Sequence, residues 1–263
     1  MTTKLAFKGV TKGFAGAGGW MPAIQEMDLE IEAGEFVCIV GPSGCGKTTL
    51  LNLAAGFIKP DQGEVLLDGA GVREPGPDRA LVFQENALFP WLTVQKNIEL
   101  GMDLAGKPKK ERQVVSDFYL RLVHLDKFRN SLVHELSGGM KQRVQLARAM
   151  ALSPSLFLMD EPFAALDALT REFLYEEIQN ILGATNQTVL FITHNVREAV
   201  VLADRVVVMG GAHPGHIKAQ FKVDLPRPRS FDSKGVDQLI TSTMALLKTD
   251  VQMEEAPADG RVR

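Results

Sequence analysis

The chain has 263 residues, with 29 lysines and arginines against 32 aspartates and glutamates, which gives a formal net charge of −3. This length supports a buried core in one large domain or two small ones, and the small, mixed charge excludes a disordered polyelectrolyte and a protein that mainly coats nucleic acid. No stretch approaches the roughly 18 apolar residues of a membrane-spanning helix, the first residues lack the apolar core of a secretory signal, and two cysteines are too few for a disulfide scaffold. We therefore expect a reduced, cytoplasmic chain without a membrane segment of its own.

Five short apolar runs predict strands, at residues 36–40, 80–83, 155–159, 188–193 and 205–209. Longer stretches with helical periodicity lie between them, an alternation that favours a mostly parallel sheet covered by helices on both faces. Residues 90–150 break this alternation, because they contain no good strand and have a mostly helical pattern. The charged residues 107–112 within them are interpreted as a solvated helix start. The predicted fold class is α/β, with an inserted helical subdomain.

The pattern weakens after residue 210, where glycines and prolines at 210–215 mark a turn. A further helix is predicted in the tail, with Asp232 or Ser233 as its cap. Its apolar positions are Val236, Leu239, Ile240, Thr243, Met244 and Leu247. The sequence Leu-Pro-Arg-Pro-Arg at 225–229 is interpreted as a stiff, solvated linker, and residues 254–263 are expected to be disordered.

A glycine-rich loop follows the first predicted strand. Its sequence is Gly41-Pro-Ser-Gly-Cys-Gly-Lys-Thr48, which fits the pattern G-x-x-x-x-G-K-[ST], and a helical run follows at 49–55. Glycines let the backbone N–H groups surround an anion, and the helix start adds the positive end of its dipole. Lys47 can hold the β and γ phosphates of a nucleotide, and the Thr48 hydroxyl can hold Mg²⁺. The loop predicts a nucleoside triphosphate site, but it does not separate a kinase, a GTPase and a transport ATPase.

The strand predicted at 155–159 is followed by two carboxylates, Asp160 and Glu161. A buried strand can deliver Asp160 to the edge of the sheet beside the phosphate loop, where it can hold Mg²⁺ directly or through water. Glu161 can orient or deprotonate the attacking water, because hydrolysis needs a base near the γ phosphate. A charge pair that only caps a turn is the alternative, and the phosphate loop disfavours it.

A second helix start suited to anions lies in the sequence His134-Glu-Leu-Ser-Gly-Gly-Met-Lys-Gln-Arg143. With this segment the chain resembles the ATP-binding subunits of ABC transporters, whose signature sequence it matches except for Met140 in place of glutamine. Further motifs occur in the order of that family. Gln84 matches the Q-loop glutamine, Asp167 the D-loop aspartate and His194 the switch histidine.

The resemblance covers about residues 4–230 and implies a P-loop NTPase core of the RecA type. The implied boundaries are 1–86 and 153–222 for the two parts of the ATP-binding core, 87–152 for the helical subdomain that carries the signature, and 223–263 for a tail with one helix and a disordered end. Phe14 stands where the family has an aromatic ring that stacks on adenine, with Trp20 nearby as an alternative. The resemblance also implies two ATPase chains packed head to tail, with each ATP between the phosphate loop of one chain and residues 137–139 of the other.

ATP and Mg²⁺ are the cofactors that the resemblance implies, and it assigns roles to the site residues. The implied catalytic residues are Lys47, Gln84, Glu161 and His194. The implied Mg²⁺ ligands are Thr48, Gln84 and Asp160. The implied nucleotide-binding residues are Phe14, Gly41, Pro42, Ser43, Gly44, Cys45, Gly46, Lys47, Thr48, Thr49, Gln84, Ser137, Gly138, Gly139, Asp167 and His194.

An apolar sequence, Leu-Phe-Pro-Trp at 88–91, lies at the boundary of the predicted insertion. It is either a core patch beneath the insertion or a groove in which Leu88, Phe89 and Trp91 receive a membrane-spanning permease subunit, the partner that the resemblance implies. Together with residues 75–79 and 225–229, it resembles the nitrate/sulfonate/taurine importer family. That likeness implies import of a small anion such as nitrate, a sulfonate, taurine or bicarbonate. It also implies a second ATPase subunit in a homodimer or heterodimer, an indirect link to a periplasmic or extracellular solute-binding protein, and a peripheral place on the cytoplasmic face of the inner membrane.

The alternative from a different class is a soluble ABC-type ATPase that acts on nucleic acid or ribosomes. Such proteins carry two ATPase units or long coiled coils, whereas this chain has one phosphate loop, no sustained heptads and a near-neutral charge that argues against a nucleic-acid partner. A kinase would not need residues 137–139, and the guanine-reading motif Asn-Lys-x-Asp of a GTPase is missing. The presence of Glu161 and His194 argues against a catalytically silent regulatory subunit.

Overall fold

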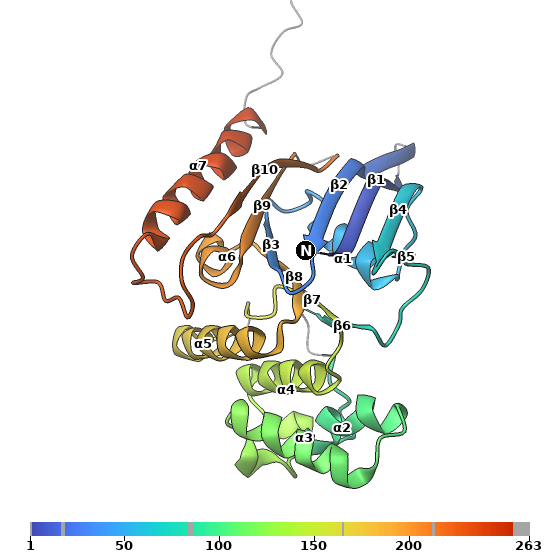
Figure 1. The fold of residues 1–263 in the computed structure, drawn as a ribbon, viewed down its shortest axis with the longest axis vertical. Coiled ribbons are helices and arrows are strands. Elements are labelled where there is room, and N and C mark those ends of the chain that lie inside the picture. Colours follow the sequence, from blue (N-terminus) through green and yellow to red (C-terminus); the bar gives the residue numbers. More distant parts are fainter. Residues whose placement is uncertain (1, 17–18, 84–86, 165, 212–213, 255–263) are drawn as a thin grey trace, which may run out of the picture.

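The computed structural model describes residues 2–16, 19–83, 87–164, 166–211 and 214–254 (Figure 1). They form two β-sheets, helices packed against these sheets, and a group of helices at one end of the molecule. No helix within these ranges is long and apolar enough to cross a membrane. Cys38 and Cys45 are both buried and free.

A six-stranded sheet lies at the centre of the molecule, in the order β10-β9-β3-β8-β7-β6. Its strands are β3 (Phe36–Val40), β6 (Arg79–Val82), β7 (Leu156–Asp160), β8 (Thr188–Thr193), β9 (Arg205–Gly210) and β10 (His216–Lys222). The strands from β9 to β6 run parallel, and β10 pairs with β9 in the antiparallel direction. The five strands predicted from the sequence are the five parallel ones, so the parallel α/β arrangement is confirmed and β10 is an addition.

Alternate residues of these strands pack on opposite faces, which explains why their sequences are continuously apolar. In β3, Phe36 and Cys38 belong to the hydrophobic cluster on one face, whereas Val37 and Ile39 belong to the cluster on the other face. Helices α5 (Ala168–Thr185), α6 (Val196–Leu202) and α7 (Val236–Glu254) contribute to the first cluster, and α1 (Lys47–Ala55) contributes to the second. The predicted cover of helices on both faces is therefore present.

A second sheet, with four antiparallel strands, is absent from the sequence prediction. Its order is β2-β1-β4-β5, and its strands are β1 (Thr3–Gly16), β2 (Gly19–Glu32), β4 (Gln62–Leu67) and β5 (Ala70–Gly71). Phe7, Leu29 and Val65 from this sheet share a hydrophobic cluster with α1 and with one face of the parallel sheet. Helix α1 therefore packs between the two sheets, and Cys45 of the loop before it belongs to the same cluster.

The helices of the insertion lie at the lower end of the molecule in Figure 1, away from the antiparallel sheet. They are α2 (Val94–Leu104), α3 (Lys109–Leu122) and α4 (Gly138–Ala151), with 3-10 turns at Asp126–Phe128 and Val133–Glu135. These helices share a hydrophobic cluster of their own that includes Ile98, Leu120 and Val144. The helical pattern predicted for 90–150 is confirmed. Residues 107–110 are exposed at the start of α3, and Lys107 pairs with Glu111, as a solvated helix start requires.

The tail packs firmly against the core, and here two expectations are wrong. Arg229 is only 5% exposed, because its guanidinium donates hydrogen bonds to the main-chain carbonyls of Val200, Ala203, Val223 and Leu225. This burial lowers the pKa of Arg229 to about 10, and residues 225–229 are not a solvated linker. Helix α7 begins at Val236, and the Ser233 hydroxyl accepts a hydrogen bond from the Ser230 amide rather than capping that helix. Residues 255–263 lie outside the described residues.

Candidate active site

Three adjacent strands of the parallel sheet end at one edge and bring most of the predicted residues together. The phosphate loop follows β3, His194 follows β8, Asp160 is the last residue of β7, and Glu161 comes directly after it. Because β3, β8 and β7 are consecutive in the sheet and parallel, their carboxyl ends meet, which is where ligands bind in open α/β sheets.

Glycine is required at two positions of the phosphate loop. Gly44 and Gly46 have φ angles of 83° and 87°, in the left-handed region that disfavours other residues. Gly46 precedes the first residue of α1, and a Cβ built there would lie 2.9 Å from the carbonyl oxygen of Ala23 in β2. The antiparallel sheet therefore supports the loop from behind, and a larger residue at Gly46 would push the two apart.

Lys47 folds back over the loop that precedes it. Its side chain is nearly buried, at 8% exposure, and its Nζ donates hydrogen bonds to the carbonyl oxygens of Gly41 at 2.9 Å and Pro42 at 2.7 Å. Nζ also lies 3.8 Å from the Cys45 sulfur. The ammonium group is therefore held at the beginning of the loop, in reach of any anion that the loop amides surround.

Asp160 and Thr48 connect β7 to the phosphate loop through a side-chain hydrogen bond. Burial raises the pKa of Asp160, and the charge of Glu161 adds to this rise. The Thr48 hydrogen bond and the Lys47 ammonium act in the opposite direction, because both stabilise the carboxylate. A hydroxyl oxygen and a carboxylate oxygen thus lie together beside the loop, and both are oxygen ligands of the kind that Mg²⁺ prefers.

Glu161 and His194 form a pair across adjacent strands. Glu161 Oε2 and His194 Nδ1 are hydrogen-bonded at 2.8 Å, with 19% of the glutamate side chain and 69% of the histidine side chain exposed. Glu161 has a positive φ of 45°, which is rare for this residue type, and its amide donates to the Ile192 carbonyl at 2.9 Å. Strained backbone of this kind recurs at functional sites. The turn after β7 therefore aims a carboxylate at an accessible imidazole.

The signature residues lie at the start of α4. Ser137 caps this helix, because its hydroxyl accepts a hydrogen bond from the Met140 amide, and Gly138 is exposed. A Cβ built at Gly139 would lie 3.4 Å from Leu166, the residue before Asp167. Within the described ranges, no hydrogen bond joins Ser137, Gly138 or Gly139 to the phosphate loop. A single chain does not bring its two anion-binding helix starts into contact.

Asp167 precedes the first turn of α5 and caps it. Its carboxylate accepts hydrogen bonds from the Thr170 amide at 2.9 Å and the Thr170 hydroxyl at 2.7 Å, and these bonds lower the pKa of Asp167. Arg143 of the signature helix lies close enough for the negative charge of Asp167 to favour the charged form of the arginine. The D-loop aspartate and the signature helix are thus neighbours in one chain.

Phe14 and Trp20 project to opposite faces of the β1–β2 ribbon, because the strand register pairs Phe14 with Met21 and Ala15 with Trp20. Phe14 is 48% exposed. The Trp20 ring covers Gly13, where a built Cβ would lie 2.3 Å from the indole, and its side chain hydrogen-bonds to Asp61. Trp20 is 57% exposed although it lies over Gly13, and the Lys12 ammonium lies 5.7 Å from the centre of the Phe14 ring, so both rings have neighbours and an open face.

Gln84 lies outside the described residues. The strand before it, β6, is tied to the signature helix, since Gln145 of α4 donates a hydrogen bond to the Phe83 carbonyl at 3.0 Å.

Residues 88–91 were predicted to be either a core patch or an exposed groove, and each alternative holds for some of them. Leu88 is buried in the helical core, as a core patch requires, whereas Phe89 and Trp91 are 37% and 71% exposed.

Two buried charged residues on or beside α6, the helix that follows His194, were not predicted from the sequence. Glu198 is a buried carboxylate on α6, four positions after His194, and Arg229 is bonded to main-chain carbonyls near the end of the same helix. A signal for Glu198 was available, because it is the one carboxylate of α6, in which the other residues except Arg197 are apolar. No local signal marks Arg229, whose partners are distant in the sequence.

The chain is similar to known proteins over most of its length. The ABC transporter family profile matches residues 24–164. The nitrate import ATP-binding protein NrtD of Synechococcus elongatus is 46% identical, over 86% of this chain and 83% of that relative. The bicarbonate transport ATP-binding protein CmpC of the same species is also 46% identical, over 87% of this chain and 35% of that longer relative. Among solved structures, the dimeric ATP-binding cassette MJ0796 bound to ADP and Pi matches with a TM-score of 0.75 and 31% identity, over 84% of this chain and 100% of that one.

The chain therefore belongs to the ABC transporter family. It is an ATP-binding subunit of that family, of the class that hydrolyses ATP in transporter complexes. The predicted resemblance to nitrate-type ATPase subunits and the predicted P-loop NTPase fold are both confirmed. A soluble ABC-type ATPase without a role in transport is not favoured.

Proposed function

We propose that this chain hydrolyses ATP to power a membrane importer for a small anion of the nitrate, sulfonate, taurine or bicarbonate type. The observation that carries the proposal is the meeting of the phosphate loop, Asp160 and the Glu161–His194 pair at the ends of three adjacent strands. The nitrate and bicarbonate relatives support the class of solute. The chain would work at the cytoplasmic face of the inner membrane beneath its permease, in a complex with an external solute-binding protein, and without nucleic acid.

The nucleotide roles follow from the geometry of the loop. The loop amides from Gly41 to Thr49 would surround the phosphates, with Lys47 on the β and γ groups. Thr48 and Asp160 fit Mg²⁺ because their oxygens lie together beside the loop, and Gln84 would complete the set. Bound Mg²⁺ would neutralise charge on the β and γ phosphates. Among the residues described, no group of three or more histidine, cysteine or acidic side chains could hold a metal ion.

Hydrolysis would use the Glu161–His194 pair. Glu161 accepts a proton from the attacking water, and His194 contacts the γ phosphate while its Nδ1 stays bonded to the glutamate. The imidazole is mostly exposed, so it can reach a nucleotide on the loop. The half-exposed ring of Phe14 would stack on adenine, and Trp20, whose ring lies over Gly13 on the opposite face of the ribbon, is the alternative.

A second ATPase chain would complete the site. The exposed start of α4, with Ser137 and Gly139, is not joined to the phosphate loop of its own chain, so it is available to the ATP of another. Asp167 lies next to this helix start and would face the same interface. We also propose the domain boundaries at 86 and 152, because the inserted helices have a separate hydrophobic cluster, whereas the boundary at 222 is the end of strand β10.

The permease would bind near Phe89 and Trp91. Their rings meet edge to face, with centroids 5.5 Å apart, and the Arg148 guanidinium lies 5.5 Å from the Phe89 ring. The backbone under them is rigid, because the buried Asn97 bonds to Phe89 in both directions and to the carbonyls of Leu92 and Thr93. Exposed aromatic side chains on a rigid base are typical anchors of protein interfaces.

The decisive test of the function is reconstitution. The chain would be purified with the membrane protein that accompanies it and placed in liposomes, with MgATP on the side of the ATPase. Nitrate, taurine and bicarbonate would be offered one at a time with the solute-binding protein. ATP-dependent uptake of one of these anions is the expected result. ATP hydrolysis with no bound membrane protein and no uptake would contradict the proposal.

Replacing Phe89 and Trp91 together by serine is expected to lower anion uptake by about tenfold or more, the usual loss when two interface anchors are removed. ATP turnover of the purified chain should change by less than about twofold, because both side chains are exposed and outside the site. Uptake and phosphate release would be measured on the same preparations. Phe118→Ser on α3 is the matched control, since this ring is also exposed, at 52%. Normal uptake in the double variant would remove these residues from the permease contact.

A further inference from the structure

Glu198 is a buried acid that the proposed hydrolysis does not use. It is 4% exposed, and a carboxylate in such a place is costly unless its oxygens are hydrogen-bonded. Both oxygens have partners. The Tyr175 hydroxyl donates to Oε1 at 2.7 Å, and the Thr193 hydroxyl donates to Oε2 at 2.6 Å. One carboxylate thus joins helix α5, helix α6 and the end of strand β8.

The Thr193 end of this network holds the turn that carries His194. The Thr193 hydroxyl donates to Glu198 and at the same time accepts a hydrogen bond from the Asn195 amide at 2.9 Å. Asn195 in turn caps α6, because its side chain accepts from the Arg197 amide at 3.0 Å. The residues on both sides of His194 are therefore fixed. The imidazole itself is 69% exposed and has one hydrogen-bond partner in the described structure, Glu161.

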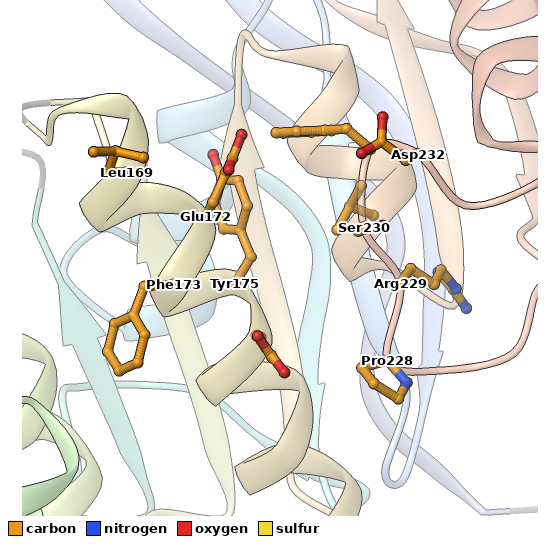
Figure 2. A pocket seen from close by; sticks show the side chains of 11 residues that line it. Leu169, Glu172, Phe173, Tyr175, Pro228, Arg229, Ser230 and Asp232 are labelled. Carbon is orange, nitrogen blue, oxygen red and sulfur yellow. The ribbon is translucent and has the colours of Figure 1, made fainter.

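The Tyr175 end reaches the segment that follows Glu161. The Tyr175 ring is buried and packs edge to face on Phe163, with centroids 5.2 Å apart, and on Phe231 of the tail, with centroids 5.8 Å apart. Figure 2 shows Tyr175 pointing from α5 into the gap between that helix and residues 228–232, while Arg229 turns away from it. The same tyrosine therefore touches the acid behind His194, the chain behind Glu161 and the tail.

A small cavity of about 70 Å³ connects this network with the active site, since Glu161, His194 and Glu198 all line it. Arg171 also lines it and lies 4.0 Å from Glu198, while its other nitrogen donates to the Leu166 carbonyl beside Asp167. The carboxylate is thus close behind the Glu161–His194 pair, and in the described part of the chain it makes no hydrogen bond to either side chain.

We propose that Glu198 is a positioning residue for His194, which acts through the Thr193 hydroxyl and is itself fixed by Tyr175. This positioning role rests on the proposed function, in which His194 contacts the γ phosphate. The buried carboxylate keeps the turn at 193–195 rigid, so the imidazole holds its hydrogen bond to Glu161 when nucleotide binds. Catalytic groups need such support, since a side chain that is displaced by an ångström loses much of its effect.

Thr193→Val tests the proposal with little change of shape, because valine removes the hydroxyl and keeps the branched side chain. ATP turnover is expected to fall by about tenfold, with the KM for ATP unchanged, as loss of one buried hydrogen bond can produce. In a His194→Ala background the same substitution should have no further effect, since Thr193 acts only through the histidine. Thr188→Val is the matched control. This threonine is buried at the other end of β8, and its hydroxyl bonds to the Gly34 amide.

A second readout does not depend on hydrolysis. The His194 imidazole resonances of the labelled full chain, assigned by their loss in His194→Ala, should shift in Thr193→Val and in Glu198→Ala, and return toward normal in Glu198→Gln. They should not move in Thr188→Val. Unchanged His194 resonances, or an equal loss of turnover in the presence and absence of His194, would overturn the proposal. If the wild-type chain does not hydrolyse ATP, the proposed function fails, whereas the resonances still decide whether Glu198 positions His194.

Discussion

Glu161→Gln should hydrolyse ATP about 10²–10⁴-fold more slowly than the wild-type chain, the range expected when a general base is lost. The substitution preserves the size of the side chain, and its amide oxygen can still accept the hydrogen bond that His194 Nδ1 makes with Oε2. It removes the basic oxygen that would take the proton from water. ATP binding should stay within about twofold of normal, because the phosphate loop and Thr48 are untouched. Phosphate release and nucleotide titration of the purified chain measure the two effects.

The Glu161→Gln variant also tests whether two chains pair around ATP. If ATP closes two chains around two sites, a protein that binds ATP and cannot cleave it should accumulate as a dimer. Light scattering with and without MgATP would show the doubling of mass. Glu176→Gln, on the exposed side of α5, is the matched control and should hydrolyse ATP normally. Near-normal turnover of Glu161→Gln would remove this residue from the role of base. A protein that binds ATP and stays monomeric would show that a different ATPase chain or the permease must complete the pair.

The parallel sheet could be predicted because its strands are buried on both faces. Each of them has an uninterrupted run of apolar residues, as in Phe36–Val40, which is fully buried. The antiparallel sheet has one buried face and was not predicted. Strand β1 carries lysines at 4, 8 and 12 and has several bulges that interrupt its alternation. Strand β2 gave a clearer signal, because Met27, Leu29 and Ile31 are buried and alternate with exposed acidic residues.

The site could be predicted where chemistry is encoded in neighbouring residues. The phosphate loop, the carboxylates after β7 and the helix start at Ser137 each form one short segment with a recognisable context. The Glu161–His194 contact joins residues 33 apart, and it depends on β7 and β8 being neighbours in the sheet. Strand order is set by the packing of the whole domain, and no local pattern contains it. The register that pairs Asp160 with Ile192 is what brings the acid and the histidine together.

The tail is another segment whose place in the structure could not be predicted from local composition. Two prolines and two arginines in 225–229 have the composition of a solvated linker. Arg229 is buried instead, because α6 ends with carbonyls at Val200 and Ala203 that need donors, and a positive charge is favourable at a helix C-terminus. Gln179 of α5 completes the attachment with hydrogen bonds to the amide and carbonyl of Arg229, 50 residues away. The need for a donor arises only when the helix end has been placed by folding.

Lys47→Ala is expected to weaken ATP binding by about 100-fold or more, since a lysine in such a loop makes charge-assisted hydrogen bonds to phosphate that are each worth about 1.5–3 kcal/mol. The position of the side chain explains why no neighbour can replace it. Its ammonium is held over the loop by the Gly41 and Pro42 carbonyls, so the charge is in place before the anion arrives. Isothermal titration with MgATP would measure the loss.

Two comparisons separate this loss of affinity from a loss of the fold. Lys4→Ala removes a lysine whose side chain is also largely buried, at 12% exposure, and whose partner is Asp68 in a different part of the chain. It should bind ATP normally. Thermal unfolding should show that Lys47→Ala stays folded, because the loop is also held by glycine conformation and by the contact of Gly46 with β2. A folded Lys47→Ala protein with unchanged ATP affinity would contradict the phosphate-loop assignment, and the roles given to Asp160, Glu161 and His194 depend on that assignment.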